Sequence, residues 1–395
     1  MSWSNRIKKF FRKFRIVKKW GVAVRDRLGL PLHDPGPETA IDLGYRWLCL
    51  AQDNSASGDG GVACNYNIVS GWGPSYPETT GYIVRTMLDY AKLKNCRDAR
   101  NRAARMLDWL VSIRFDEGGF QGGIITDTPV VPVTFNTGQI LLGLAYGVRE
   151  FGDKYREPMI RAADWLVRVQ DPDGCWRKYP SPFAGSPVKA FDTHAAWGLL
   201  EAAKIEPGKA YAEAALKNIE WALTCRHDNG WFERCTLEDD PYPVTHTIGY
   251  VLRGILEAHL FTGDRKLLEA SEITANALIS ALGDDGFLAG AFDSDWKAAV
   301  PWVCLTGTVQ IAHCWLLLYL ITHEKKYRDA GFLGNKFVRR TMRIGTPGET
   351  QGAIKGSFPV NGRYLSYLYP NWATKFCVDS NMAEKAIREK EGLFL

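Results

Sequence analysis

Side chains suited to acid–base chemistry recur at the start of successive apolar segments of the sequence. Glu78 stands in "YPETTGY", Asp192 and His194 in "FDTHAAW", His246 in "VTHTIGY" and Asp295 in "FDSDW". Carboxyl and imidazole groups are the commonest general acids and bases in enzymes. We therefore take these five residues as the candidate catalytic groups, although they are scattered over more than two hundred positions.

Aromatic and amide side chains accompany them at equivalent positions. Aromatic rings suit sugar stacking, and amides both donate and accept hydrogen bonds. The candidate substrate-binding residues are Tyr76, Asn136, Gln139, Tyr250, Asp293, Trp296, Trp302, Gln310, Tyr369, Asn371 and Trp372. Capping of a helix N-terminus is the alternative role for Asp192, Asn136 and Asn371, whereas histidine is not a typical cap.

An internal repeat predicts the elements that position these residues. Amphipathic segments ending in an Asp/Asn-Gly turn and an aromatic, such as "DWLVRVQDPDGCW", recur at spacings of 62, 56, 56, 56 and 60 residues. Their anchor positions are Trp47, Trp109, Trp165, Trp221, Ala277 and Phe337. The glycine supplies the left-handed conformation that ends a helix. Self-similarity at a fixed period indicates a repeat architecture.

A second series of helical segments interleaves with the first and is apolar nearly all round. "TGQILLGLAYGV" and "TGTVQIAHCWLLLYLI" are examples. Such helices are buried on all sides. The sequence thus predicts an all-α protein, an (α/α)6 toroid over residues 37–385 with six inner and six outer helices. We expect the inner helices to start near residues 79, 136, 192, 246, 306 and 371.

The repeat resembles the α/α toroid superfamily of terpenoid cyclases, protein prenyltransferase β-subunits and six-hairpin glycosidases. "QDPDGCW", residues 170–176, matches the QxxxGxW motif of the cyclases. Through "LTGTVQIA" and "YPNWATK" the body also resembles uncharacterised toroid proteins associated with bacterial surface-polysaccharide biosynthesis. These resemblances imply the fold, while function has to be argued from the site.

Two features of similar families fit the residues of this chain poorly: the catalytic acid of class II terpenoid cyclases and the zinc site of lanthionine cyclases. Class II cyclases carry a DxDD acid, but "DSDW" has Trp296 where the last aspartate belongs. Cys304, His313 and Cys314 resemble the zinc ligands of lanthionine cyclases in reversed order. Adjacent helical residues point ~100° apart, which separates His313 from Cys314. We therefore expect no metal and no cofactor.

Parallel inner helices would gather their N-termini, with their partial positive charge, at one mouth. We expect that mouth to favour anions, to lower the pKa of buried histidines and to keep nearby carboxylates ionised. The main hypothesis is a carbohydrate-active enzyme acting on an anionic or lipid-linked glycan in surface-polysaccharide biosynthesis. A uronate lyase or epimerase would use the histidines, and a glycoside hydrolase would use paired carboxylates. The alternatives are a class II terpenoid-cyclase-like enzyme and a non-catalytic glycan-binding or scaffold protein.

The N-terminal segment has a different character from the body. Its first 27 residues hold ten of the 49 Lys and Arg against one of the 44 acids, leaving a net charge of −4 elsewhere, which argues against nucleic-acid binding. Trp3, Ile7, Phe10, Phe14 and Val17 form one helical stripe opposite basic residues. We expect residues 1–30 to be a basic amphipathic segment that binds an anionic membrane through residues 1–20.

The number and spacing of the cysteines indicate the redox state of the compartment in which the protein resides. The nine cysteines are scattered and include no CxxC pair, which favours free thiols in a reducing compartment. Together with the basic segment, this predicts a cytoplasmic protein that is peripheral on the inner face of the cell membrane.

Overall fold

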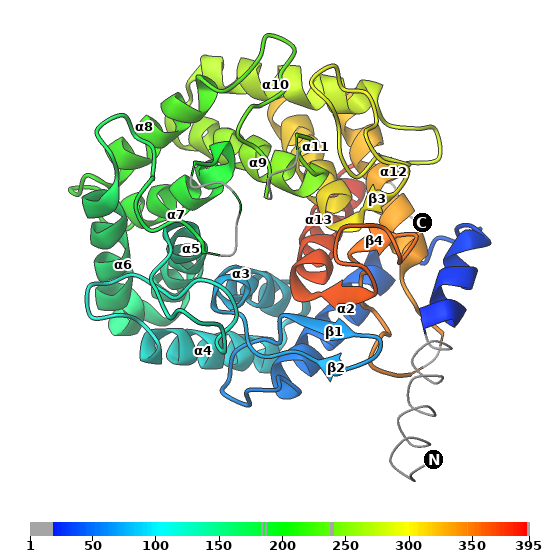
Figure 1. The fold of residues 1–395 in the computed structure, drawn as a ribbon, viewed down its shortest axis with the longest axis horizontal. Coiled ribbons are helices and arrows are strands. Elements are labelled where there is room, and N and C mark those ends of the chain that lie inside the picture. The colour runs from blue at the N-terminus through cyan, green and yellow to red at the C-terminus, as the bar shows by residue number, and fades with distance from the viewer. Residues whose placement is uncertain (1–18, 183–184, 186–187, 238–240, 346, 393–395) are drawn as a thin grey trace, which may run out of the picture.

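The computed structural model describes residues 19–182, 185, 188–237, 241–345 and 347–392. In this part of the chain, twelve α-helices alternate between an inner and an outer ring (Figure 1). The inner helices are α3 (Pro77–Lys94), α5 (Thr134–Phe151), α7 (Thr193–Ala203), α9 (Thr245–Thr262), α11 (Leu305–Thr322) and α13 (Asn371–Lys390). The outer helices are α2 (Gly36–Asp53), α4 (Arg97–Ser112), α6 (Arg156–Val169), α8 (Tyr211–Leu223), α10 (Arg265–Ser280) and α12 (Lys325–Thr341). The predicted (α/α)6 toroid is confirmed, and each inner helix starts within two residues of its expected position.

Each inner helix packs on the next, and α13 closes the ring by packing on α3 and on the outer helix α2. Two short 3-10 helices, η1 (Gly152–Tyr155) and η2 (Ala190–Asp192), precede α6 and α7. The long loops before the inner helices hold short strands. β1 (Asn65–Asn67), β2 (Gly71–Trp72) and β5 (Leu368–Pro370) form an antiparallel sheet of order β2-β1-β5, and β3 (Val303–Cys304) pairs with β4 (Ser357–Phe358). The pairing of β1 with β5 joins the loop before α3 to the loop before α13.

Glycines allow neighbouring inner helices to touch through their backbones. A Cβ atom added to Gly138 of α5 would overlap Ala195 of α7, and one added to Gly143 would overlap the carbonyl of Gly81 in α3. The same holds for Gly307 of α11 against α9. Small residues at these contacts keep the ring narrow, so larger side chains of the inner helices must point to its centre or to the outer helices.

The turns after the outer helices use one arrangement six times. A glycine with φ between +79° and +108° lies in each turn, at positions 60, 118, 174, 230, 286 and 352, five or more residues after the outer helix has ended. The expectation that this glycine terminates the helix is therefore wrong, because the residues that directly follow the helices, such as Gln170 and Thr224, have negative φ. In the QxxxGxW segment, the Gln170 amide donates to the carbonyls of Gly174 and Ala214 at 2.9 and 2.8 Å, and Trp176 Nε1 donates to the Leu166 carbonyl at 3.0 Å. The motif therefore fastens one outer helix to the next, which is a structural role.

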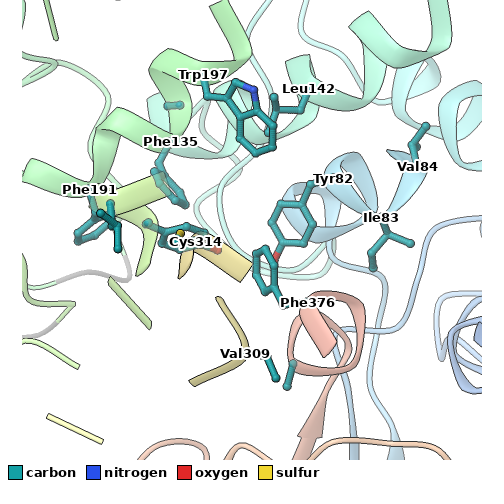
Figure 2. Packing of buried hydrophobic residues seen from close by; sticks show 14 of the residues in the cluster. Tyr82, Ile83, Val84, Phe135, Leu142, Phe191, Trp197, Val309, Cys314 and Phe376 are labelled. Carbon is teal, nitrogen blue, oxygen red and sulfur yellow. The ribbon is translucent and has the colours of Figure 1, made fainter. Parts of the chain in front are cut away.

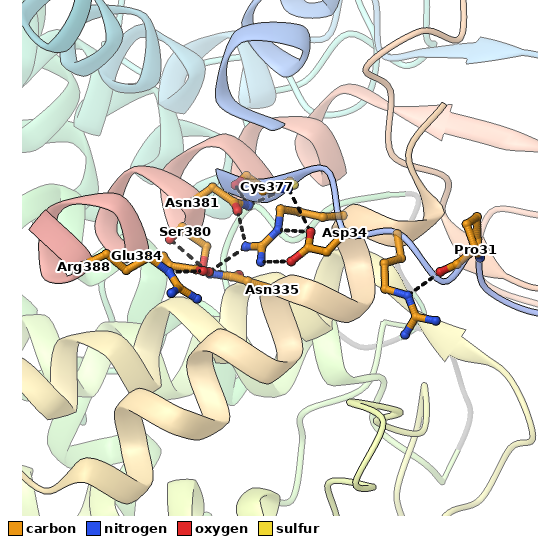
Figure 3. Close-up of polar contacts among 11 residues, drawn as sticks. Pro31, Asp34, Asn335, Cys377, Ser380, Asn381, Glu384 and Arg388 are labelled. Carbon is orange, nitrogen blue, oxygen red and sulfur yellow. Dashed lines mark hydrogen bonds and ion pairs between the residues drawn. The ribbon is translucent and has the colours of Figure 1, made fainter. Parts of the chain in front are cut away.

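A buried ionic cluster ties the two ends of the repeat together (Figure 3). Arg339 of α12 donates to both carboxylate oxygens of Asp34, just before α2, at 2.8 and 2.7 Å. Its other amino group donates to Asn381 and Glu384 of α13, both at 2.7 Å. Glu384 is fully buried and also accepts from Arg388 Nε at 2.8 Å, so the buried charges of the cluster are balanced through several contacts rather than one.

Residues 19–27 form a helix that packs on the body beside α12 (Figure 1). Asp26 is buried there, where it pairs with Lys355 at 2.5 Å and accepts a hydrogen bond from the Val360 amide at 2.7 Å. The part of the predicted membrane-surface segment that includes Trp3, Phe10 and Phe14 lies outside the described residues.

Helix α11 is long and apolar enough to cross a membrane by length and composition, and within the described ranges it is the one helix that meets this criterion, with a mean hydropathy of 1.4. In the toroid it packs on α9, α12 and α13. Its composition is accounted for by this enclosure.

The replacement Gly138→Ala tests the close approach of the inner helices. We expect it to lower the free energy of unfolding by about 1–3 kcal/mol because the added methyl group overlaps Ala195 in a tightly packed interface. Gly208→Ala is the matched control, since nothing lies within 4 Å of the added atom there. Urea denaturation of both variants measures the effect; equal stability would contradict this packing account.

Candidate active site

A cavity of about 360 Å³ opens at the N-terminal ends of the inner helices. Tyr76 and Glu78 come from the start of α3, Asn136 from α5, His246 from α9 and Trp372 from α13. The remaining lining residues are Thr79, Tyr82, Gly123, Ile124, Asp127, Phe135, Ser181, Lys189, Phe191, Leu237, Tyr250, Tyr364 and Leu365. Figure 2 shows Tyr82, Phe135 and Phe376 projecting from three helices toward the centre of the ring. Six of the predicted site residues are thus brought together in one cavity: Tyr76, Glu78, Asn136, His246, Tyr250 and Trp372.

Glu78 is a buried carboxyl with one strong hydrogen bond. The hydroxyl of Tyr76 donates to its Oε2 at 2.7 Å. Burial raises the pKa of Glu78 to about 7, although the Tyr76 hydroxyl and the charge of Lys189 act in the opposite direction. Asn136 lines the same wall, and among the described residues its buried Nδ2 finds no hydrogen-bond acceptor. The cavity wall therefore holds a carboxyl group, that of Glu78, which can give or take a proton near neutral pH. It also holds an amide donor, Asn136 Nδ2, that finds no acceptor among the described residues.

Lys189 places a buried positive charge in the cavity wall. The side chain is 5% exposed, and its ammonium group lies 5.6 Å from the centre of the Phe191 ring. Burial lowers the pKa of Lys189, while the charges of Asp192 and Glu78 raise it. Sequence analysis missed this lysine. It stands in a loop three residues before Asp192 in "VKAFDTHAAW", and helix periodicity carries no signal there.

His246 has a neutral imidazole ring, and one of its two nitrogens is held by a hydrogen bond. Its Nδ1 lies 2.6 Å from Oε1 of Gln310. An amide oxygen only accepts, so Nδ1 carries the hydrogen and Nε2 keeps its lone pair. Burial lowers the pKa of His246 to about 4, which leaves the ring neutral near pH 7. This is the protonation state of a general base.

His194 has the same environment but does not line the cavity. Its Nδ1 lies 2.6 Å from Oε1 of Gln139. The ring of Tyr250 lies between the two histidines, 4.5 Å from that of His194 and 4.4 Å from that of His246. Gln139 and Gln310, predicted to bind substrate, therefore orient the two imidazoles.

A layer of three cations lies further along the inner helices; Lys375 and Arg253 are buried, whereas the side chain of Arg85 is 24% exposed. Lys375, Arg253 and Arg85 follow Trp372, Tyr250 and Tyr82 by three residues. Burial, followed by the charges of Lys375 and Arg253 and then that of Arg85, lowers the pKa of His194 well below its usual value. Each cation has an acid partner on its own helix, as in the pair of Lys375 with Asp379 at 2.6 Å.

The aspartates of "FDSDW" lie outside this cavity. Asp293 Oδ1 accepts from the amides of Asp295 and Lys297 at 3.0 and 2.8 Å, which forms a tight turn, and the Asp295 side chain is 71% exposed. Trp296 donates from Nε1 to the carbonyl of Asn229 at 3.0 Å. The expectation that Asp295 joins the other catalytic candidates is not met, because turn geometry rather than helix position sets its direction. A cyclase-like acid at this motif would likewise be remote from the cavity.

Four further predicted residues are also placed elsewhere. Trp302 lines a neighbouring cavity of about 470 Å³ and Tyr369 is buried in β5. Asn371 donates to the Ala63 carbonyl and to Thr79 Oγ1 at 2.9 and 2.8 Å, tying α13 to the first repeat. Asp192 is buried near Lys189 but does not line the cavity, and it makes no side-chain capping bond to α7.

The expected charge state of the carboxylates is wrong. We expected the helix ends to keep them ionised, but burial raises the pKa of both Glu78 and Asp192 to about 7. Desolvation outweighs the charge of Lys189 for both groups. The lowered pKa of the histidines has the expected direction and the same cause.

The described residues contain no group of three or more His, Cys, Asp or Glu side chains arranged to hold a metal ion. Of the three zinc-like candidates, Cys304 and Cys314 are buried free thiols. His313 Nδ1 lies 3.4 Å from Nη1 of Arg253, in the cationic layer.

No family model and no curated protein sequence matches this chain. Among solved structures, an unsaturated glucuronyl hydrolase specific for heparin is 16% identical with a TM-score of 0.72, over 89% of this chain and 98% of that chain. A D-mannose isomerase is 12% identical with a TM-score of 0.67, over 90% and 99%. A cellobiose 2-epimerase from Bacillus thermoamylovorans is 12% identical with a TM-score of 0.67, over 88% and 98%. These similarities establish the α/α six-hairpin toroid fold.

The raised pKa of Glu78 predicts a specific pH dependence of stability. Its protonated form is favoured in the folded state, so the stability it contributes is present below about pH 4.5 and is lost as the pH rises through about 7. Between pH 5 and pH 8 the wild type should therefore lose about 2 kcal/mol relative to Glu78→Gln. Urea denaturation at both pH values measures this difference. Glu269→Gln, on an exposed part of α10, controls for the change of carboxylate to amide; a pH-independent difference for Glu78→Gln would contradict the assignment.

Proposed function

We propose that this protein is a carbohydrate-active enzyme that moves a proton on a uronate residue of a glycan, as an epimerase or lyase. The observation that carries the proposal is the combination of Glu78, His246 and Lys189 in one cavity. Environments that push the pKa of an acid up and that of a base down are typical of acid–base catalytic pairs. Here they raise the pKa of Glu78 to about 7 and lower that of His246 to about 4.

The substrate class follows from the charge and shape of the cavity. Lys189 offers a buried cation to a sugar carboxylate, and Asn136 Nδ2 offers a hydrogen-bond donor. The ring of Tyr76 meets that of Trp372 edge to face at 5.9 Å, which gives one wall an aromatic surface for a sugar ring. The fold likeness to an unsaturated glucuronyl hydrolase and to a cellobiose 2-epimerase supports a saccharide substrate.

In the proposed reaction, Lys189 pairs with the uronate carboxylate and stabilises negative charge that develops on it. Nε2 of His246 takes the proton from C5, and the electron pair of the C5–H bond moves toward the carboxyl group. Protonated Glu78 then returns a proton to C5 from the other face, which inverts that centre. If Glu78 instead protonates the departing O4, the C4–O bond breaks and a C4–C5 double bond forms, which is a lyase reaction.

Hydrolysis is the second candidate because a second carboxylate, Asp127, also lines the cavity. Glu78 would then act as the acid and Asp127 would activate water. Asp127 accepts a hydrogen bond from the Ile124 amide at 2.9 Å, so its carboxylate also holds the loop. A non-catalytic glycan-binding protein would use the same cavity without turnover.

We place this activity at the inner face of the cell membrane, on a surface-polysaccharide or lipid-linked glycan. The support is the basic amphipathic pattern of residues 1–20 beside a body of net negative charge. The anchoring residues Trp3, Phe10, Phe11 and Phe14 lie outside the described part of the chain.

Two substitutions separate substrate binding from proton transfer. Lys189→Gln should raise KM for uronate oligosaccharides about tenfold or more, because a buried charge-assisted contact is lost. It should leave binding of neutral oligosaccharides of the same length unchanged. Glu78→Gln should lower kcat by about 10²-fold or more without a comparable change in KM. Lys178→Gln, exposed on the same loop, is the matched control. Loss of neutral-sugar binding in Lys189→Gln would contradict the carboxylate role.

Removal of residues 1–18 tests the membrane proposal while keeping the Asp26–Lys355 pair. The truncated protein should stay folded and lose co-sedimentation with vesicles rich in anionic lipid, since ~1 kcal/mol of attraction is expected for each basic residue at the surface. Full-length protein with vesicles of neutral lipid is the control. If the truncated protein sediments as well as the full chain, residues 1–18 are not the anchor.

A further inference from the structure

A second cavity, of about 340 Å³, lies outside the ring between the helix of residues 19–27 and the C-terminal end of α12. The N-terminal helix contributes Arg25 and Asp26 to it, the last turn of α12 contributes Arg340, and the segment after α12 contributes Arg343. The other polar lining residues are Tyr66, Thr341, Glu349, Thr350, Lys355 and Tyr369. Its walls thus come from segments more than three hundred residues apart in the sequence.

The position of the N-terminal helix is fixed by a buried ion pair. Asp26 and Lys355 are 6% and 5% exposed, and their charges lie 2.5 Å apart. Arg340 adds a hydrogen bond from Nε to the Pro31 carbonyl at 2.5 Å, which Figure 3 shows at the labelled Pro31. Because both contacts bridge the cavity walls, the cavity is part of the folded structure rather than a gap beside a loose helix.

The cavity carries an excess of positive charge. Asp26 is neutralised by Lys355, so the acid left to balance three guanidinium groups is Glu349. Arg25 and Arg343 are exposed at the opening, and the side chain of Arg343 donates from Nη1 to Thr350 Oγ1 at 3.4 Å. Guanidinium groups present a planar fork of donors that matches phosphate oxygens.

We propose that this cavity binds a phosphate group, as a phosphomonoester or diphosphate, through Arg25, Arg340 and Arg343. The hydroxyls of Thr341 and Thr350 offer further donors, and Val22, Ile68, Met342 and Phe358 give the cavity an apolar wall beside the arginines. That combination suits a phosphate attached to an apolar chain as well as a free phosphate.

The site is independent of the proposed sugar chemistry but shares a chain segment with its cavity. Phe358 and Tyr369 line the phosphate cavity, whereas Tyr364 and Leu365, between them in sequence, line the candidate active site. The segment from β4 to β5 therefore contributes residues to both cavities.

Calorimetric titration of the full-length protein tests the proposal, with inorganic pyrophosphate and with monomeric short-chain phosphatidic acid as probes. The double variant Arg25→Gln/Arg343→Gln removes two exposed side chains of the site. We expect it to weaken binding of at least one probe about tenfold or more, since charge-assisted contacts are lost. Arg97→Gln/Arg265→Gln is the matched control, because both arginines are exposed at the starts of α4 and α10.

The two probes also identify the source of the phosphate. Variant-sensitive binding of phosphatidic acid alone assigns the site to a lipid phosphate, and variant-sensitive binding of pyrophosphate assigns it to a soluble one; either result supports the site. The proposal is overturned if neither probe binds. It is also overturned if Arg25→Gln/Arg343→Gln weakens binding no more than Arg97→Gln/Arg265→Gln does, since the probes would then bind without using this cavity.

Discussion

Neighbouring inner helices touch through their backbones, and this close contact sets the width of the ring. Glycines at positions such as 138, 143 and 307 leave no room for even a methyl group between neighbouring helices. The ring is therefore narrow, and the first turns of the six inner helices are brought near one another at its mouth. Side chains separated by fifty or more residues, such as Glu78, Asn136 and His246, consequently share one cavity.

Burial then sets the chemistry of these side chains. The helix ends and Lys189 both favour negative charge at the mouth, yet desolvation raises the pKa of Glu78 and of Asp192 to about 7. The same loss of water keeps His194 and His246 neutral. A site with a proton-donating carboxyl, a proton-accepting imidazole and a lysine results from packing as much as from residue type.

The sequence predicted the features that recur in every repeat, and it did not predict features that occur in a single loop or turn. The six-fold pattern located the inner helix starts within two residues, and with them Tyr76, Glu78, Asn136, His246, Tyr250 and Trp372 in the cavity. Lys189 was not predicted because it lies in a loop, and the periodicity of the sequence does not predict the path of a loop. Asp295 was misplaced because local hydrogen bonds to Asp293 turn it outward. The charge of Glu78 could not be read from sequence, since it depends on how completely the cavity excludes water.

Proton NMR of uronate oligosaccharides incubated with the protein in D₂O detects proton transfer at C5. If the protein moves this proton, the H5 signal of a uronate residue disappears as deuterium enters at C5, or an olefinic H4 signal replaces it. The assay reads the proton transfer itself, whichever product is formed. An unchanged H5 signal across uronates of different configuration and linkage, with or without new reducing-end signals, would contradict proton transfer at C5.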